Sequence, residues 1–213
     1  MKPSALRIKV YVLGILLLIG MIMIFDADIQ KTLQDHRSTT TDGLSKMVKP
    51  LGDGRIVVPV FIGVSIAGGV LQVPSLVNLG LTTLGALSLD GILTGTLQAA
   101  LGRQRPFKGK GPNSYDPFSE GGSFPSGHTS VVFNVATILS TQYKSYGIIP
   151  VLSYSLAGLV GFSRINDNKH FASDVLAGAL VGIVTAQLAL RIRKNIKQIL
   201  GKIKAFYRAF SPE

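Results

Sequence analysis

Long apolar runs separated by short polar segments dominate this sequence. We predict six membrane-spanning segments from them, at about residues 8–25, 56–72, 75–102, 127–142, 146–163 and 173–190. A helix needs about 20 apolar residues to cross about 30 Å of hydrocarbon, and most of these runs come near that length. Helices are expected because a backbone in lipid must satisfy its hydrogen bonds internally. The pattern therefore predicts an all-α integral membrane protein built as a six-helix bundle.

The polar segments between these runs complete a single domain over residues 1–213. Residues 26–50 contain helix-compatible stretches, so we expect an external interfacial helical segment between the first two spans. The tail, residues 191–213, mixes basic residues with Ile, Leu, Phe and Tyr. Two structures suit that mixture, a helix lying on an anionic leaflet or an ordinary solvated tail. No small-x-small cleavage site follows the uncharged run 10–25, so we interpret that run as a retained span.

Composition supports the membrane class and limits the choice of partners. Hydrophobic residues make up 46% of the chain and charged residues 15%, below the roughly 25% of soluble domains, and the mean hydropathy is +0.38. The net charge of +11 suits anionic membrane lipids or a phosphorylated substrate. Nucleic acid is not expected, because the basic residues flank apolar blocks. The chain has no cysteine, which excludes thiolate nucleophiles and disulfides.

Six spans would place both termini on one side of the membrane. Lys and Arg divide evenly, eleven on each side, when the loops are assigned by these spans. The dense basic cluster directly after the last span nevertheless favours cytoplasmic termini. We therefore expect the termini in the cytoplasm and the opposite loops outside it.

Three polar clusters interrupt the apolar pattern, each at a span end on the same predicted side. Topology alone therefore gathers arginines, two histidines, serines and an aspartate in one place. The clusters are Arg103-Gln104-Arg105-Pro106, then Phe124-Pro125-Ser126-Gly127-His128, then Ser163-Arg164 with His170 and Asp174.

These residue types suit a phosphate. The guanidinium groups of Arg105 and Arg164 are planar forks that match phosphate oxygens. Ser126 and Gly127 lie where the fourth span starts, and the free N–H groups of a helix start bind anions. Together they can hold a tetrahedral phosphate whose charge is spread over its oxygens.

The two histidines suggest nucleophilic catalysis. His170 and Asp174 are four residues apart, so they share one face if the last helix begins near Asp167 or Asn168. The carboxylate can then accept from one ring nitrogen of His170 and leave the other free as a nucleophile. The second histidine, His128, supplies another titrating group, for protonating the leaving oxygen and activating water. We expect neither a metal nor another cofactor, because the arginines neutralise the phosphate charge.

The clusters resemble the tripartite signature of the type 2 phosphatidic acid phosphatase superfamily, integral membrane lipid phosphatases related in fold to vanadium haloperoxidases. That signature reads Lys, six residues, Arg-Pro; then Pro-Ser-Gly-His; then Ser-Arg, five residues, His, three residues, Asp. The second block matches at 125–128 and the third at 163–174, with both gaps intact. The resemblance implies His170 as nucleophile through a phosphohistidine, Asp174 as its orienting partner and His128 as general acid. It implies phosphate binding by Arg105, Ser126, Gly127 and Arg164.

The resemblance also implies a metal-independent site at the outer face of the membrane, which we expect to be a bacterial inner (plasma) membrane. The expected reaction is dephosphorylation of phosphatidate, phosphatidylglycerol phosphate, a polyprenyl diphosphate or a lipid A phosphate. One alternative is phosphotransfer from the same phosphohistidine to a lipid acceptor. Another is a transporter or non-catalytic phosphate-binding protein. The oligomeric state stays open.

One position departs from the signature. Gln98 stands seven residues before Arg105, where the family has Lys. In one interpretation, Gln98 faces the phosphate and donates a neutral hydrogen bond. In the other, Gln98 is a spectator and the charge comes from Arg103 or Lys108. Separately, the intramembrane Asp90 is interpreted as structural, hydrogen-bonded to hydroxyls such as that of Thr94 or to a neighbouring helix.

Overall fold

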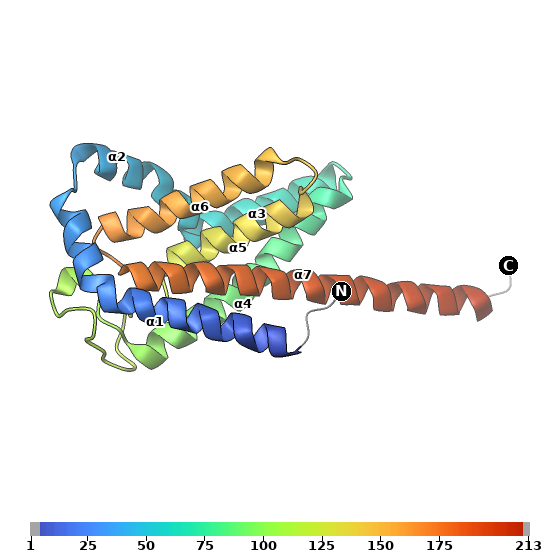
Figure 1. Cartoon of the computed structure of the whole chain (residues 1–213). Coiled ribbons are helices and arrows are strands. Elements are labelled where there is room, and N and C mark those ends of the chain that lie inside the picture. The colour runs from blue at the N-terminus through green and yellow to red at the C-terminus, as the bar shows by residue number, and fades with distance from the viewer. Residues whose placement is uncertain (1–4, 211–213) are drawn as a thin grey trace.

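A computed structural model describes residues 5–210 and shows an all-helical bundle (Figure 1). The described residues contain no β-strand, only an isolated bridge between Arg103 and Tyr115, so the predicted all-α class is confirmed. The elements are α1 (Ala5–Asp35), α2 (Thr39–Val48), η1 (Lys49–Gly52), α3 (Gly54–Val70), α4 (Pro74–Leu101), η2 (Pro106–Lys108), α5 (Gly127–Gln142), α6 (Ile148–Asn166) and α7 (Ala172–Phe210).

Each of the six predicted spans falls on a helix, but fewer than six are long and apolar enough to cross a membrane unaided. Among the described residues, four helices meet that test, namely α1, α4, α6 and α7. A fifth is added if α2 with η1 and α3, which are bent by 50° at Asp53, form one broken span. The remaining helix, α5, has 16 residues and lies in the middle of the bundle. The count of six therefore stays a prediction.

Two helices run further than their apolar runs. The first was predicted to end at residue 25, but α1 continues to Asp35, because Asp26 and Gln30 point inward and are buried. The last was predicted to end at residue 190, but α7 continues to Phe210 and projects from the bundle (Figure 1). The basic tail is thus helical as far as it is described. Its contact with a leaflet stays a prediction.

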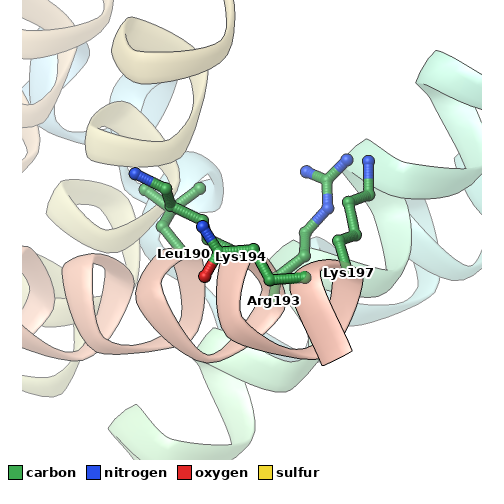
Figure 2. A pocket seen from close by; sticks show the side chains of 5 residues that line it. Leu190, Arg193, Lys194 and Lys197 are labelled. Atoms are coloured by element: carbon green, nitrogen blue, oxygen red, sulfur yellow. The ribbon is translucent and has the colours of Figure 1, made fainter. Parts of the chain in front are cut away.

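The projecting part of α7 carries the basic cluster. Arg193, Lys194 and Lys197 line a surface hollow of about 360 Å³ beside Leu190 (Figure 2). The hollow lies about 20 residues along α7 from the helix start, or about 30 Å at 1.5 Å per residue. This is the end of the bundle away from the three polar clusters.

The connection between α1 and α3 contains the helix that the sequence predicts. Ser38 caps the start of α2, since its hydroxyl accepts from the Thr41 amide and the Thr41 hydroxyl accepts from the Ser38 amide. The side chain of Asn166 donates to Ser45 at 3.0 Å and so fastens α2 to the end of α6. Whether α2 lies at the membrane surface stays a prediction.

The centre of the bundle is α5, which packs against α4, α6 and α7. The approach to α7 is close because Gly178 and Gly182 face α5. A Cβ atom on Gly182 would come within 2.2 Å of the Ser130 carbonyl oxygen, and one on Gly178 within 2.4 Å of the Ser126 carbonyl oxygen. Small residues at a spacing of four are the usual means of close helix packing in membranes. This packing fixes the start of α5 against the start of α7.

A buried polar cluster joins α4, α5 and α7 below the site. Asp90 accepts hydrogen bonds from the hydroxyls of Ser130 and of Thr185, the latter at 3.2 Å. Asn134 in turn donates to Thr185 at 2.9 Å. An intramembrane carboxyl group is costly unless it is hydrogen-bonded. The partners of Asp90 are hydroxyls, as predicted, but Thr94 is not one of them, because it contacts Ser130 at 3.4 Å. The structural role of Asp90 stays a prediction.

The end of α4 directs the first polar cluster into the site. Gly102 terminates α4 with φ of +56°, and a Cβ there would lie 1.7 Å from the Asp116 carbonyl oxygen, so only glycine fits. The chain then turns away from the helix axis. The loop 102–126, the starts of α5 and α7 and the end of α6 gather at one end of the bundle (Figure 1).

Candidate active site

A cavity of about 450 Å³ lies at this end of the bundle. Five of its lining residues are Lys or Arg and none is acidic, which suits an anion with several charges. Its walls come from η1, α3, α4, the loop after α4, α5, α6 and the loop before α7. The lining residues are Lys49, Arg55, Gln98, Arg105, Phe107, Gly127, His128, Arg164, Lys169 and His170.

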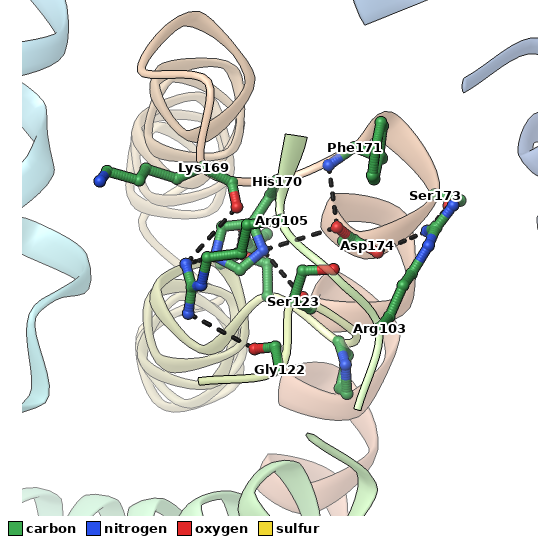
Figure 3. A network of polar contacts seen from close by, with 12 residues as sticks. Arg103, Arg105, Gly122, Ser123, Lys169, His170, Phe171, Ser173 and Asp174 are labelled. Atoms are coloured by element: carbon green, nitrogen blue, oxygen red, sulfur yellow. Dashed lines mark hydrogen bonds and ion pairs between the residues drawn. The ribbon is translucent and has the colours of Figure 1, made fainter. Parts of the chain in front are cut away.

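His170 lies between Arg105 and Asp174 (Figure 3). Its Nδ1 is 2.8 Å from the Ser123 carbonyl oxygen and 3.7 Å from a carboxylate oxygen of Asp174. A carbonyl oxygen only accepts, so Nδ1 carries the proton and Nε2 carries a lone pair. The Nη1 of Arg105 is 3.3 Å from Nε2. The free nitrogen of the ring is therefore on the side of the cavity.

The environment also keeps His170 neutral. Burial lowers the pKa of His170, and the nearby Asp174 and the Ser123 carbonyl oppose that shift only in part. A neutral imidazole is the form in which His170 can act as a nucleophile near pH 7.

The route by which Asp174 reaches His170 differs from the prediction. The last helix begins at Ala172, not near Asp167 or Asn168, so His170 lies in the preceding loop and the two residues do not share a helix face. The carboxylate is fully buried and does not line the cavity. Its short contacts are with Arg103 at 2.6 Å and with the Phe171 amide at 2.8 Å. Its ion-pair contact with His170 is the longer one, at 3.7 Å.

Both predicted phosphate-binding arginines line the cavity. Arg105 is held by the Gly121 carbonyl at 3.0 Å, and burial lowers the pKa of its guanidinium, which Asp174 opposes. Arg164 is held by Ser163 at 3.3 Å and by an ion pair with Asp167. Arg105 also contacts the carbonyl oxygens of Lys169 and Gly122 at 3.4 Å and Nε2 of His170 at 3.3 Å. A guanidinium has five N–H donors, so one remains for a ligand on Arg105 and more remain on Arg164. The protein contacts therefore hold both guanidinium groups in place and leave N–H donors for a phosphate.

The start of α5 supplies further groups, with one correction. Gly127 and His128 line the cavity, but Ser126 does not. Ser126 is fully buried, its amide donates to the Asp174 carbonyl at 2.9 Å and its hydroxyl accepts from Thr129. It thus ties α5 to α7 instead of offering donors to a ligand. By contrast, the buried Nε2 of His128 has no hydrogen-bonding partner in the described chain.

The structure places Gln98 at the cavity and Arg103 away from it. Gln98 lines the cavity, where its amide donates to the Pro125 carbonyl at 2.8 Å. Arg103 is fully buried and bound to carboxylates, while Lys108 donates to Gln104 at 2.8 Å, and neither lines the cavity. Gln98 and Arg105 share no helix face, because α4 ends at Leu101. They meet because the loop folds back onto the cavity.

Sequence reasoning missed two groups of residues. Lys49, Arg55 and Lys169 line the cavity although they lie outside the three polar clusters. Basic residues next to spans are common, so nothing in the sequence distinguished them. Asp26 is fully buried and paired with Arg103 at 2.7 Å. Asp26 directly follows the first apolar run, where polar residues are common, so the sequence did not distinguish it either.

Comparison with known proteins adds to this geometry. The sequence profile of the PAP2 superfamily matches residues 79–198, more than half of the chain. Over 103 residues the chain is 39% identical to a lipid A 1-phosphatase of Porphyromonas gingivalis, covering 48% of this chain and 21% of that protein. An undecaprenyl-diphosphatase of Sulfolobus acidocaldarius is 26% identical over 85% of each chain. The chain spans less than half the length of the first curated relatives that it matches.

A solved structure shows the same fold. The transmembrane PAP2-type phosphatidylglycerolphosphate phosphatase of Bacillus subtilis superposes with a TM-score of 0.68 at 22% identity, over 86% of this chain and 96% of that one. The likeness concerns the fold, and the four helices that are long and apolar enough to cross a membrane support an integral membrane protein. The profile match includes all three polar clusters in full, and Gln98 with them. The chain belongs to the PAP2 superfamily.

Proposed function

We propose that this protein removes a phosphate from a membrane lipid phosphate or diphosphate, without a metal, through a phosphohistidine on His170. The observation that carries the proposal is the unprotonated Nε2 of His170, 3.3 Å from the Arg105 guanidinium, in a cavity lined by cations and no carboxylate. A nucleophile placed beside a fixed cation can attack an anionic phosphate that the cation binds.

The reaction would proceed in two steps. In the first, Nε2 of His170 forms a bond to phosphorus, the bond between phosphorus and the lipid oxygen breaks, and protonated His128 gives its proton to that oxygen. In the second, neutral His128 takes a proton from water, the water oxygen attacks phosphorus, and the N–P bond breaks to release inorganic phosphate. The unpartnered Nε2 of His128 supports this role.

The surrounding groups would stabilise the transferring phosphoryl group. Arg105 and Arg164 would bind its equatorial oxygens, and the start of α5 at Gly127 would add amide donors. Asp174 would stabilise the charge that develops on the ring of His170, and Ser126 would hold α5 against α7. The lipid tails would extend from the cavity into the membrane.

We also propose six membrane crossings, with α5 and the bent α2–α3 pair included. The short, polar α5 would cross because α4, α6 and α7 surround it and shield it from lipid. Both termini would then be cytoplasmic and the cavity would face the outer side, in a bacterial inner (plasma) membrane. The basic stretch of α7, about 30 Å from the site, supports this orientation.

Four substrates remain candidates, namely phosphatidate, phosphatidylglycerol phosphate, a polyprenyl diphosphate and a lipid A phosphate. The relatives named above act, by their names, on the last three kinds of lipid. A phosphotransferase would use the same phosphohistidine and differ only in its acceptor.

The proposal predicts phosphate release that survives EDTA. Arg105 and Arg164 supply the positive charge, so removing divalent cations should change kcat by less than about two-fold. The measurement is inorganic phosphate released by the purified protein from each of the four lipids, with and without EDTA. Loss of activity restored by Mg²⁺ would contradict the proposal. Dephosphorylation of the lipid without free phosphate would indicate transfer to an acceptor.

Gln98 allows a second prediction. Its amide is 2.8 Å from the Pro125 carbonyl at the cavity wall, so Gln98→Ala should lower kcat/KM by about ten-fold, equivalent to one hydrogen bond. Gln98→Lys should keep or raise activity, because its ammonium would meet the phosphate. Steady-state kinetics on both variants, with Gln142→Ala as a distant glutamine control, test this. Wild-type behaviour of Gln98→Ala would make the residue a spectator.

A further inference from the structure

A fully buried network of charges lies behind the catalytic histidine. Arg103 donates to Asp174 at 2.6 Å and to Asp26 at 2.7 Å (Figure 3 shows Arg103 and Ser173 beside Asp174). Ser173 donates from its amide to Asp26 at 2.9 Å and also bonds to Arg103 at 2.7 Å. All four side chains are inaccessible to solvent. Buried charges are costly, so a network of this kind is retained for a reason.

Asp26 comes from a part of the chain that the motifs do not include. It lies on α1, outside the residues 79–198 that match the family profile and 77 residues before Arg103. The rest of α1 faces outward on most sides, with Ile24 and Phe25 exposed. Through Asp26, α1 thus contacts the charge network behind His170.

Asp26 acts first as a helix cap. The residue before α7 is Phe171, which has no side-chain acceptor. Asp26 instead accepts from the Ser173 amide in the first turn, and Asp174 accepts from the Phe171 amide. Two carboxylates therefore satisfy the free amides of the helix start and favour its positive dipole end.

Asp26 also decides the charge that His170 experiences. Arg103 alone would neutralise Asp174, and the pair would offer His170 no net charge. With Asp26 as a second carboxylate on the same guanidinium, the three groups sum to one negative charge. That charge favours the positive character which the ring of His170 develops as Nε2 bonds to phosphorus.

We infer that Asp26 is a positioning residue for the reaction, which caps α7 and keeps Asp174 negative toward His170 through Arg103. The inference rests on the proposed function for its kinetic consequence. The effect of Asp26 on the ring of His170 does not depend on that function, because it can be measured in the absence of turnover.

The other charged groups around His170 oppose the carboxylates. Arg105 from the loop after α4 is 3.3 Å from its Nε2, and Arg164 of α6, His128 of α5 and the neighbouring Lys169 line the same cavity. These groups stay in place when Asp26 changes. Loss of one negative charge should therefore lower the pKa of His170, because its protonated form loses a favourable interaction.

The first test is Asp26→Asn, compared with Asp28→Asn, which changes an exposed aspartate two residues along the same helix. We expect Asp26→Asn to lower kcat by about ten- to a hundred-fold with KM within about two-fold. The acid limb of its pH–rate profile should move to lower pH by on the order of one unit. Asp28→Asn should match wild type in all three. Unchanged kcat and an unchanged acid limb in folded Asp26→Asn would overturn the inference.

A second variant separates the cap from the charge. Asp26→Asn keeps a side-chain oxygen that can accept from the Ser173 amide, so only the charge is lost, whereas Asp26→Ala removes both the cap and the charge. Asp26→Ala should show the same shift of the acid limb as Asp26→Asn. If neither variant folds, as judged by gel filtration and thermal unfolding in detergent, the role of Asp26 is structural and the inference is wrong.

The titration of His170 by NMR, in protein labelled at histidine, distinguishes this inference from the proposed function. A lower pKa in Asp26→Asn than in wild type supports the coupling, whether or not a lipid is hydrolysed. If wild type releases no phosphate from any lipid phosphate while the titration shifts, the proposed function fails and the coupling stands. If wild type is active and the titration does not move, the coupling fails alone.

Discussion

Replacement of His170 by alanine should reduce phosphate release by at least about three orders of magnitude, because a covalent route without its nucleophile keeps only the contribution of the binding groups. The ring has no structural duty that would explain such a loss. Its Nδ1 bonds only to the Ser123 carbonyl, and Asp174 keeps its bonds to Arg103 and to the Phe171 amide without it. The variant should therefore stay folded.

The measurement is phosphate release from one good substrate, together with a search for an acid-labile, alkali-stable phosphoprotein after rapid quenching. His36→Ala is the matched control, because His36 is the histidine outside the site and bonds only to the Thr32 carbonyl at 2.8 Å. A His170→Ala protein that keeps more than about a tenth of the wild-type rate would rule out the nucleophile assignment. A phosphoprotein that persists in that variant would do the same.

The sequence predicted the helices well where a helix start or stop is encoded locally. The fourth predicted span, 127–142, coincides with α5, which begins at Gly127 directly after Pro125 and Ser126. The extension of α1 was missed because Asp26 and Gln30 are polar and resemble a surface segment. Their partners, Arg103 and Asn168, are far away in sequence, so only the folded chain shows that these side chains are buried.

The candidate site was likewise predicted well in some respects and wrongly in others. Spacing alone brought Arg105, His128, Arg164 and His170 into one cavity, because span ends on one side of a bundle must lie together. The helical geometry assumed for the polar clusters was wrong wherever the chain leaves a helix. His170 lies before the start of α7 at Ala172, so the helix face assumed for His170 and Asp174 does not exist.

The residues that support others were the hardest to predict. Ser126 was expected to bind phosphate and instead bonds to α7, since its amide already has the Asp174 carbonyl as acceptor. Ser123 holds His170 through its backbone, which any residue could supply, so no sequence pattern marks it. A residue that acts through a backbone atom, or through another side chain, is recognised only in the folded structure.

Replacement of Arg105 by alanine should lower kcat/KM by about a hundred- to a thousand-fold, as expected when a preorganised cation at the developing charge is lost. Among the arginines of the cavity, Arg105 should show the largest loss, because its Nη1 is 3.3 Å from the nucleophilic nitrogen. Arg164, by comparison, is neutralised in part by Asp167. Arg105→Lys should recover part of the loss, since the ammonium keeps the charge but not the fork.

Lys110→Ala is the control, an exposed cation of the same loop that does not line the cavity, and it should change kcat/KM by less than about two-fold. The loss in Arg105→Ala should persist at high ionic strength, where long-range attraction of an anionic lipid is screened, because the effect is a contact with the phosphoryl group. Equal losses in Arg105→Ala and Lys110→Ala would instead mean that the loop only attracts the substrate by its overall charge.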